Sequence, residues 1–358
     1  MAQVVVTPNR PAQTARPAPP RRRPAREPQG LTTKQWLSRR LVHLLGAALN
    51  ALPLSVGNWL ADRGGDLFYR SAGGYRGAVV DNLRHVVGAD TALEELRAAA
   101  RVTFRHSARN FYDLLRLPHL SPDQMHASVV VLGSWSAVDE ALARGKGIVF
   151  ITGHIGAFDY AGQMIPLRGF KTVLVTARTV AEFVHEGVTY LRESQGYAVE
   201  ESTPGTVRRL VRTLRQGGTI GLATDRDFFR NGVPVRFFGE ETTLPPGAVR
   251  LALETGAPII ACIARRHKHH HTLVIEDPLW LAKSGDGTDD VQRGLEQVVE
   301  IFERHIRAAP EQWVMFQRVW PTTPAPAISV FPVGSPLEGR VLGGEASSLA
   351  AEQRPPPP

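Results

Sequence analysis

The chain has 358 residues, of which 43% are hydrophobic and 21% charged, a composition that allows a sizeable buried core. Its net charge of +8 is concentrated in the first 30 residues, which carry six arginines and one glutamate. Such a basic segment suits an anionic membrane surface or a nucleic acid, and charge alone does not choose between them. The single cysteine, Cys262, excludes an intramolecular disulfide and lies in the apolar run IIACIA, which favours a core position over a nucleophile.

The N-terminal third is predicted to be helical and to associate with a membrane. Residues 1–29 are rich in Pro and Arg, which indicates a disordered tail rather than a secretory signal. The segment Leu41–Ala61 is the only transmembrane candidate, but polar residues and a proline interrupt it. We favour a pair of interfacial helices there, with a true span as the alternative. A longer helix is expected over Ala92–Arg116, and residues 30–127 together form the membrane-associating region.

From Val129 onward, short apolar runs alternate with helical stretches. The predicted strands are Ser128–Leu132, Gly147–Thr152, Thr172–Thr176, Thr219–Ala223, Pro258–Ala264 and Thr272–Ile275. The predicted helices are Ser134–Arg144, Phe158–Leu167, Glu182–Gln195, Thr206–Gln216, Ala248–Thr255 and Asp289–Ala308. This alternation predicts an α/β core over residues 128–320, with a central, mostly parallel or mixed sheet flanked by helices. Residues 321–358 are expected to form a disordered Pro-rich tail.

The segment GIVFITGHIGAFDY carries the strongest candidate for catalysis. An apolar strand ends at Gly153, His154 follows it, and a helix begins near Phe158. Active residues of open α/β sheets gather at the edge of the sheet where the carboxyl ends of the strands lie. The spacing to Asp159 lets its carboxylate meet one imidazole nitrogen, so that the other nitrogen removes a proton from an attacking hydroxyl group. The alternative is a core histidine that a neighbour hydrogen-bonds.

The spacing between His154 and Asp159 is weak evidence by itself, because it recurs in His85/Asp90 and His271/Glu276. Only His154 has the preceding strand and glycine. The chain has no GxSxG, Walker A or GxGxxG motif, which favours direct attack by the acceptor over a covalent acyl-enzyme. The histidines of HKHHH are closely spaced on an expected hairpin, so an exposed turn is favoured over a metal site.

Several segments of the sequence resemble a known family. GHIGAFD is similar to the HxxxxD/E block of glycerolipid acyltransferases. Five further blocks, in order, resemble bacterial lipid A late acyltransferases, and the DRD form is closer to phosphatidylinositol mannoside acyltransferases of actinobacteria. These blocks are Asn82–His85, Thr224–Gly239, Pro246–Ala248, Thr255–Pro258 and Pro310–Trp313, and the resemblance covers residues 35–320. One departure is PPGAVRLA, where relatives often have GPA and where Arg250 alters the surroundings of the pocket.

The resemblance implies an enzyme, an O-acyltransferase that moves a fatty acyl group from acyl-CoA or acyl-carrier protein to a hydroxyl of a glycolipid, without a cofactor or metal. His154 is then the general base and Asp159 its partner. Arg178 stabilises oxyanion charge or holds an acceptor phosphate, with a surface salt bridge as the alternative. Arg226 contacts a phosphate of the donor or acceptor. Asp225 and Asp227 either contact a substrate or order the loop 232–239. The ordering role is favoured for both aspartates.

Two other functions are weighed against glycolipid acylation. A lysophospholipid acyltransferase would usually have an FPEG-type acceptor motif, which this sequence lacks. A non-catalytic lipid-binding protein on the same fold is disfavoured because His154 and Asp159 are both present. Nucleic-acid binding is not expected, because no basic and aromatic residues alternate. The partners expected are a membrane lipid acceptor, the acyl donor and an anionic surface. The expected location is the cytoplasmic face of the cell membrane, peripherally or with one N-terminal membrane segment.

Overall fold

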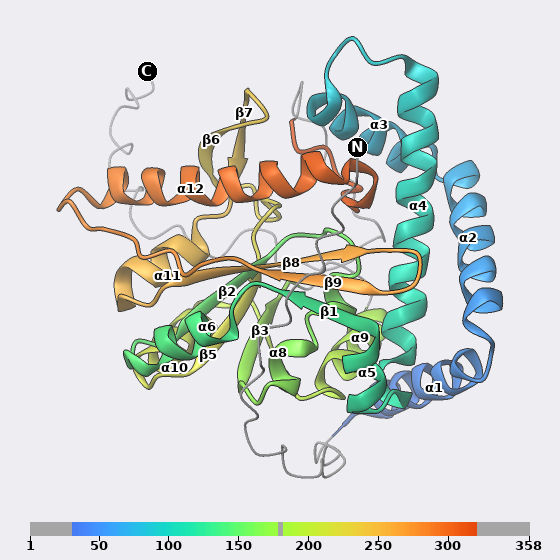
Figure 1. Cartoon of the computed structure of the whole chain (residues 1–358), viewed down its shortest axis with the longest axis horizontal. Coiled ribbons are helices and arrows are strands. Elements are labelled where there is room, and N and C mark those ends of the chain that lie inside the picture. Colours follow the sequence, from blue (N-terminus) through green and yellow to red (C-terminus); the bar gives the residue numbers. More distant parts are fainter. Residues whose placement is uncertain (1–30, 178–181, 321–358) are drawn as a thin grey trace, which may run out of the picture.

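The computed structural model of the chain describes residues 31–177 and 182–320 (Figure 1). Its N-terminal part is helical, as predicted: α1 (Thr33–Asn50), α2 (Leu54–Ser71), α3 (Gly73–Val87) and α4 (Leu93–Arg116). Thr32 begins α1 with a capping box, in which its side chain accepts from the Gln35 backbone and Gln35 reaches back. Pro53, which lacks an N–H, separates α1 from α2. Within the described residues, no helix is both long and apolar enough to cross a bilayer.

Helix α2 packs along α4 through paired charges (Figure 1). Asp66 of α2 accepts two hydrogen bonds from Arg101 and two from Arg105, all between 2.7 and 2.9 Å. Asp62 accepts two from Arg109, both at 2.6 Å. Bidentate guanidinium–carboxylate pairs fix orientation as well as distance. Helix α4 in turn stands against the end of the sheet at which β2 finishes, so α1 and α2 lie outside the core on the same side (Figure 1).

The rest of the described chain is an α/β domain. In chain order its elements are η1 (Leu117–His119), α5 (Pro122–Ser128), β1 (Val129–Leu132), α6 (Trp135–Ala143), β2 (Ile148–Thr152), α7 (Phe158–Ala161), α8 (Met164–Leu167), β3 (Thr172–Thr176), α9 (Glu182–Glu193), β4 (Ala198–Glu201), α10 (Pro204–Arg215), β5 (Thr219–Ala223), β6 (Val233–Phe237), β7 (Glu240–Leu244), α11 (Gly247–Thr255), β8 (Ile259–Arg266), β9 (His271–Ile275), α12 (Gly287–Ala308) and η2 (Pro310–Gln312). Seven strands form one sheet in the order β1-β9-β8-β2-β5-β3-β4, and β6 and β7 form a separate hairpin.

The large sheet is mixed but mostly parallel, which confirms the predicted fold class. Only β8 and β9 pair in antiparallel fashion. Alternate side chains of β2 enter different apolar layers: Ile148 and Phe150 pack with α7, α8 and α9, and Val149 and Ile151 pack with α10, α11 and α12. Because both faces of β2 are covered, its sequence is continuously apolar.

Three details differ from the sequence prediction. Strand β4 reads AVEE and lies at an edge of the sheet, so it lacks the apolar signal of a central strand. The hairpin β6–β7 is not among the predicted strands, because Pro234 in β6 cannot donate a ladder hydrogen bond and argues against a strand. The single helix expected over Phe158–Leu167 is two short helices, α7 and α8. The tails expected at 1–29 and 321–358 lie outside the described residues.

Candidate active site

The loop after β2 is held as an extra strand against the chain that follows α12. Ile155 forms an antiparallel bridge with Trp313, and the carbonyl of His154 accepts from the Val314 backbone at 2.8 Å. These contacts fix the backbone on both sides of His154. Trp313 is buried, so the block Pro310–Trp313, noted in the sequence, supports the loop from inside the core.

His154 meets a carboxylate from the neighbouring strand, that of Asp225. Strands β2 and β5 are parallel and in register, with Thr152 beside Ala223, so the residues that follow each strand meet at one edge. The Nδ1 atom of His154 lies 2.8 Å from Oδ1 of Asp225, and the His154 backbone N–H donates to Oδ2 at 2.7 Å. The indole N–H of Trp313 also donates to Oδ2, at 3.0 Å.

The charge state of this pair follows from its surroundings. Asp225 is fully buried, which by itself raises the pKa of its carboxyl group. The charge of His154 and the hydrogen bonds from His154 and Trp313 outweigh burial, so the pKa of Asp225 lies below its usual range. An ionised Asp225 requires the proton of a neutral imidazole to be on Nδ1. The Nε2 atom of His154 then presents a lone pair.

The predicted pairing of His154 with Asp159 is corrected by this geometry. Asp159 lies in the first turn of α7 and accepts two hydrogen bonds from Arg192 of α9, at 2.7 and 3.0 Å. Burial lowers the pKa of Arg192, but the adjacent Asp159 charge raises it above its ordinary value overall. The chain turns at Gly156, which has a φ of +58°, and α7 then carries Asp159 toward α9. The carboxylate that the sequence spacing missed, Asp225, is 71 residues away from His154.

A cavity of about 270 Å³ opens beside His154 and runs between the sheet and helices α7 and α8. His154, Arg226 and Phe228 line it, and apolar side chains such as Phe150 and Leu174 form its walls. Gly221 makes room in β5, because a Cβ atom there would lie 2.6 Å from Cδ2 of Leu174. Cys262 also lines the cavity, and burial raises the pKa of its thiol to about 12, so it is no nucleophile near neutral pH.

Where β3 and β5 form a wall of the cavity, the threonine hydroxyl groups are engaged in hydrogen bonds. Thr172 and Thr219 lie side by side on β3 and β5, and their hydroxyl oxygens are 2.8 Å apart. The Thr219 hydroxyl also donates to the carbonyl of Lys171. With its hydroxyl so engaged, Thr172 presents its methyl group toward Gly221. The cavity therefore has an apolar wall on this side, while Asp159, Gln163 and Arg192 add polar groups to its lining.

A positive charge lies in the lining of the cavity. The guanidinium of Arg226 is 5.0 Å from the centre of the Phe228 ring and lines the same space as His154. Burial lowers the pKa of Arg226 from its ordinary value, and the neighbouring Asp225 opposes that change. Arg178, the other arginine singled out from the sequence, lies outside the described residues.

Asp227 organises the loop that leads to β6. Its Oδ2 accepts from the backbone of Gly232 at 2.9 Å and from the hydroxyl of Thr243 at 2.7 Å, and its Oδ1 accepts from the Asn231 backbone. These contacts agree with the favoured ordering role for Asp227, whereas Asp225, for which the same role was favoured, pairs with His154 instead.

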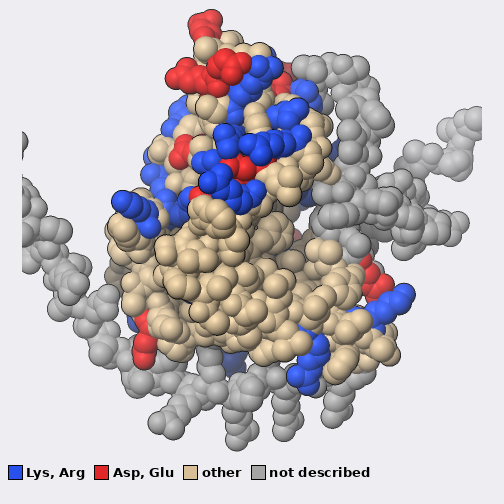
Figure 2. Space-filling model, turned by 90° about the vertical axis from the view of Figure 1, so that its right-hand side faces the viewer, with Lys and Arg blue, Asp and Glu red and all other residues tan. Residues whose placement is uncertain are grey.

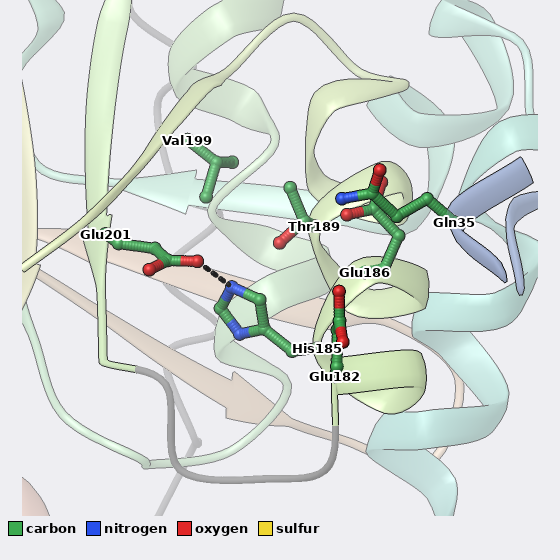
Figure 3. Close-up of a pocket in the computed structure, with 7 residues that line it drawn as sticks. All are labelled: Gln35, Glu182, His185, Glu186, Thr189, Val199 and Glu201. Atoms are coloured by element: carbon green, nitrogen blue, oxygen red, sulfur yellow. Dashed lines mark ion pairs between the residues drawn. The ribbon is translucent and has the colours of Figure 1, made fainter. Parts of the chain in front are cut away.

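A second, smaller cavity of about 110 Å³ lies between α9, β4 and the start of α1 (Figure 3). Its lining includes Glu182, His185 and Glu201, and Nε2 of His185 is 3.3 Å from Oε1 of Glu201 (Figure 3). Across the described residues, no group of three or more His, Cys, Asp or Glu side chains is placed to hold a metal ion.

The histidine-rich segment joins β8 to β9, as expected for a hairpin. His267 and His270 stack on each other, with ring centres 4.6 Å apart. His271 differs from the expected exposed turn, because it is the first residue of β9 and packs against the ring of Tyr160. Burial lowers the pKa of His271 to about 4.

Comparison with known proteins identifies a related family. A family model described as bacterial lipid A biosynthesis acyltransferase matches residues 23–322. A phosphatidylinositol mannoside acyltransferase of Mycobacterium tuberculosis (strain CDC 1551 / Oshkosh) is 28% identical over 289 residues, which are 76% of this chain and 85% of the relative. A phosphatidylinositol mannoside acyltransferase of Mycolicibacterium smegmatis is 28% identical over 260 residues, which are 67% of this chain and 77% of that relative. The matched span includes every described residue of the candidate site.

Proposed function

The chain belongs to the bacterial lipid A biosynthesis acyltransferase family and is an acyltransferase, and from this premise we propose its acceptor, donor and mechanism. The acceptor is a phosphatidylinositol mannoside, the glycolipid for which the relatives are named. The donor is an acyl thioester of coenzyme A or of acyl-carrier protein. The observation that carries the proposal is the His154–Asp225 pair beside a cavity with apolar walls.

In the proposed reaction, Nε2 of His154 accepts the proton of the acceptor hydroxyl as that oxygen attacks the thioester carbonyl. The new C–O bond gives a tetrahedral intermediate that carries negative charge on the former carbonyl oxygen. Collapse of this intermediate breaks the C–S bond, and the imidazolium returns its proton to the departing thiolate. Asp225 keeps the proton on Nδ1 and stabilises the imidazolium between the two transfers. No cofactor is consumed.

The apolar cavity is proposed to hold the acyl chain of the donor. Its walls of Phe150 and Leu174 and the methyl group of Thr172 suit a hydrocarbon. Because His154 lines the cavity, a thioester bound there would lie beside the base. Arg226, which lines the same cavity, is proposed to bind a phosphate of the donor or of the acceptor.

Helices α1 and α2 are proposed to rest on the membrane that contains the acceptor. They expose many large apolar side chains: Trp36, Leu37, Leu41, Leu44, Leu45, Leu54, Val56, Trp59, Leu60, Leu67 and Phe68. Figure 2 looks onto this side of the molecule, where a broad uncharged surface lies below a group of Lys, Arg, Asp and Glu side chains. An exposed apolar area of this kind marks an interaction site.

Basic and aromatic residues combine on these helices. The guanidinium of Arg40 lies 5.5 Å from the Trp36 ring, and that of Arg63 lies 5.4 Å from the Trp59 ring. Trp at the headgroup level and cations toward anionic lipid are typical of interfacial helices. The proposed location is peripheral, on the cytoplasmic face of the cell membrane, with the arginines of residues 1–29 adding electrostatic attraction.

The direct test incubates the purified full chain with phosphatidylinositol mannoside in detergent micelles and radiolabelled palmitoyl-CoA or palmitoyl-acyl-carrier protein. The expected product is the acceptor with one additional ester-linked acyl chain. Transfer to lysophosphatidate but not to phosphatidylinositol mannoside would instead favour a lysophospholipid acyltransferase. Absence of transfer from both donors to both acceptors would leave lipid binding without catalysis as the better description.

A further inference from the structure

A buried polar cluster lies directly behind the His154 loop and takes no part in the proposed proton transfers. Its centre is Gly156, two residues after His154. The Gly156 carbonyl accepts from Nδ2 of Asn110 in α4 at 2.7 Å, and the Gly156 N–H donates to the carbonyl of Gln312 at 2.9 Å. Each side of the Gly156 backbone therefore has a partner from a different part of the chain.

Arg266, at the end of β8, joins these two partners. Its guanidinium donates to Oδ1 of Asn110 at 2.8 Å, which requires the amide nitrogen of Asn110 to face Gly156. The side chain of Gln312 accepts from the Arg266 N–H at 2.8 Å and donates to the Arg266 carbonyl at 2.9 Å. Gly156, Asn110, Arg266 and Gln312 thus form a closed ring of hydrogen bonds, the Gly156 ring.

The guanidinium in this ring is buried and has one close counter-charge. The side chain of Arg266 is 7% exposed, and its Nη2 atom lies 2.6 Å from Oδ2 of Asp113, a buried residue of α4. A buried charge of this kind persists only when it is paired and hydrogen-bonded. The ion pair therefore holds Arg266 where it orients the Asn110 amide.

The loop cannot be secured at Gly156 by a side chain. Its φ is +58°, and a Cβ atom there would lie 2.5 Å from the carbonyl oxygen of Ala264. Only glycine fits this approach, and glycine gains the most freedom when contacts are lost. Besides the bonds of His154 to Val314 and Asp225, the position of the loop therefore depends on bonds to the Gly156 backbone.

We propose that Asn110, Arg266 and Gln312 are positioning residues, which hold His154 within reach of the reacting hydroxyl by means of the Gly156 ring. This inference rests on the proposed role of His154 as general base. It gives a function to Gln312 of the block Pro310–Trp313. Together, α4, β8 and η2 set the place of the catalytic imidazole, and the residues responsible lie more than 40 positions from it in sequence.

The discriminating variant is Asn110→Asp. A carboxylate keeps the shape of the amide and its contact with Arg266, but it cannot donate to the Gly156 carbonyl and instead faces it with an acceptor. With palmitoyl-CoA and phosphatidylinositol mannoside, kcat is expected to fall about 10- to 100-fold, the range for a small misplacement of a reacting group. The KM values for donor and acceptor are expected to stay within about twofold, because neither substrate touches Asn110.

Two companion variants separate positioning from general loss of structure. Asn110→Ser keeps a donor on a shorter side chain without the repulsive acceptor, and it is expected to lose less activity than Asn110→Asp. It also serves as the test if Asn110→Asp does not fold. Gln195→Glu is the matched control, since Gln195 is a buried amide that donates to the carbonyl of Leu117, outside the Gly156 ring. It is expected to lower Tm without changing kcat.

The decisive measurement repeats Asn110→Asp in the His154→Ala background. If Asn110 acts through His154, the residual acyl transfer of the double variant equals that of His154→Ala alone. An equal fold-loss in both backgrounds, or full kcat in folded Asn110→Asp and Asn110→Ser, would overturn the inference while leaving the role of His154 intact. Full activity of His154→Ala would instead contradict the proposed function itself.

Discussion

Asp159 lines the cavity and Asp225 is buried behind His154, and the partners of these two carboxylates give them different capabilities. Asp225 pairs with His154 at 2.8 Å, and Asp159 pairs with Arg192 at 2.7 Å. A neutral histidine has a free lone pair that accepts a proton, whereas an arginine stays protonated and acts only as a fixed charge. The similar geometries therefore support proton transfer at one place and structural support at the other.

The two carboxylates also differ in their surroundings. Asp225 is enclosed at the end of β5 and receives hydrogen bonds from both His154 and Trp313. Asp159 lies in a short helix with its side chain 16% exposed, and it joins α7 to α9. A carboxylate fixed by the sheet is better suited to orient an imidazole than one on a four-residue helix.

The largest effect is expected from His154→Ala, which removes the base from the His154–Asp225 pair. Acyl transfer should fall by about 10²–10⁴-fold, the usual contribution of a positioned general base. The change also leaves the buried Asp225 carboxylate without its imidazole partner, so Tm should fall as well. Steady-state rates and thermal unfolding measure both, and a variant with wild-type turnover would exclude His154 as the base.

Asp225→Asn is expected to follow, with a loss of about 10²-fold or more in kcat, because an amide neither fixes the Nδ1 proton nor stabilises the imidazolium. Stability should also depend on pH. The folded pKa of Asp225 is depressed, so its contribution to stability is present above the unfolded carboxyl pKa of about 3.9 and is lost as the pH falls through the lower folded value.

The difference in Tm between the wild type and Asp225→Asn should therefore be largest near neutral pH and shrink below about pH 4. Thermal unfolding monitored by circular dichroism across this range provides the measurement. A difference that stays constant with pH would mean that the Asp225 charge does not contribute to stability.

In the Asp159–Arg192 pair, Asp159→Asn should affect stability more than the acyl transfer reaction. It leaves the guanidinium of Arg192, whose side chain is 21% exposed, without its counter-charge, which should lower the free energy of unfolding by about 1–3 kcal/mol. Turnover by the folded fraction should fall less than in Asp225→Asn. Urea unfolding and kcat compare the two. Loss of turnover equal to that of His154→Ala, with unchanged stability, would give Asp159 a catalytic role after all.

A smaller effect on chemistry is expected from the exposed apolar residues. The double variant Leu44→Ser, Trp59→Ser should bind anionic phospholipid vesicles at least about 10-fold more weakly, because each side chain forfeits apolar burial in the interface. Activity on detergent-dispersed acceptor should remain. Vesicle sedimentation tests this. Val207→Ser is the control, since Val207 is an exposed apolar residue of α10, outside α1 and α2. Equal binding by both variants would remove α1 and α2 as the docking surface.

The smallest effect is expected from deletion of residues 1–29. The deletion should weaken vesicle binding at low salt and leave kcat unchanged, since only long-range attraction is lost. The difference from the full chain should disappear as salt rises. Vesicle binding that is the same with and without the segment at low salt would rule out the electrostatic contribution.

Much of the architecture followed from periodicity alone. The strand Ile148–Thr152 and the helix Leu93–Arg116 lie within one residue of their predicted bounds, because continuous apolar runs and 3.6-residue spacing are local signals. The edge strand Ala198–Glu201 carries no such signal, since half of its side chains are acidic and its pairing partner alone makes it a strand. Local patterns thus predict central elements better than edge elements.

At the site, the sequence by itself determined that His154 follows a strand at the active edge and that an acyltransferase-like order of blocks surrounds it. It did not determine the partner of His154. A spacing of five positions brings Asp159 near in the chain, but the turn at Gly156 and the start of α7 aim it at Arg192. Only the parallel register of β2 and β5 brings Asp225 to the imidazole, because strand pairing joins residues without regard to their separation in sequence.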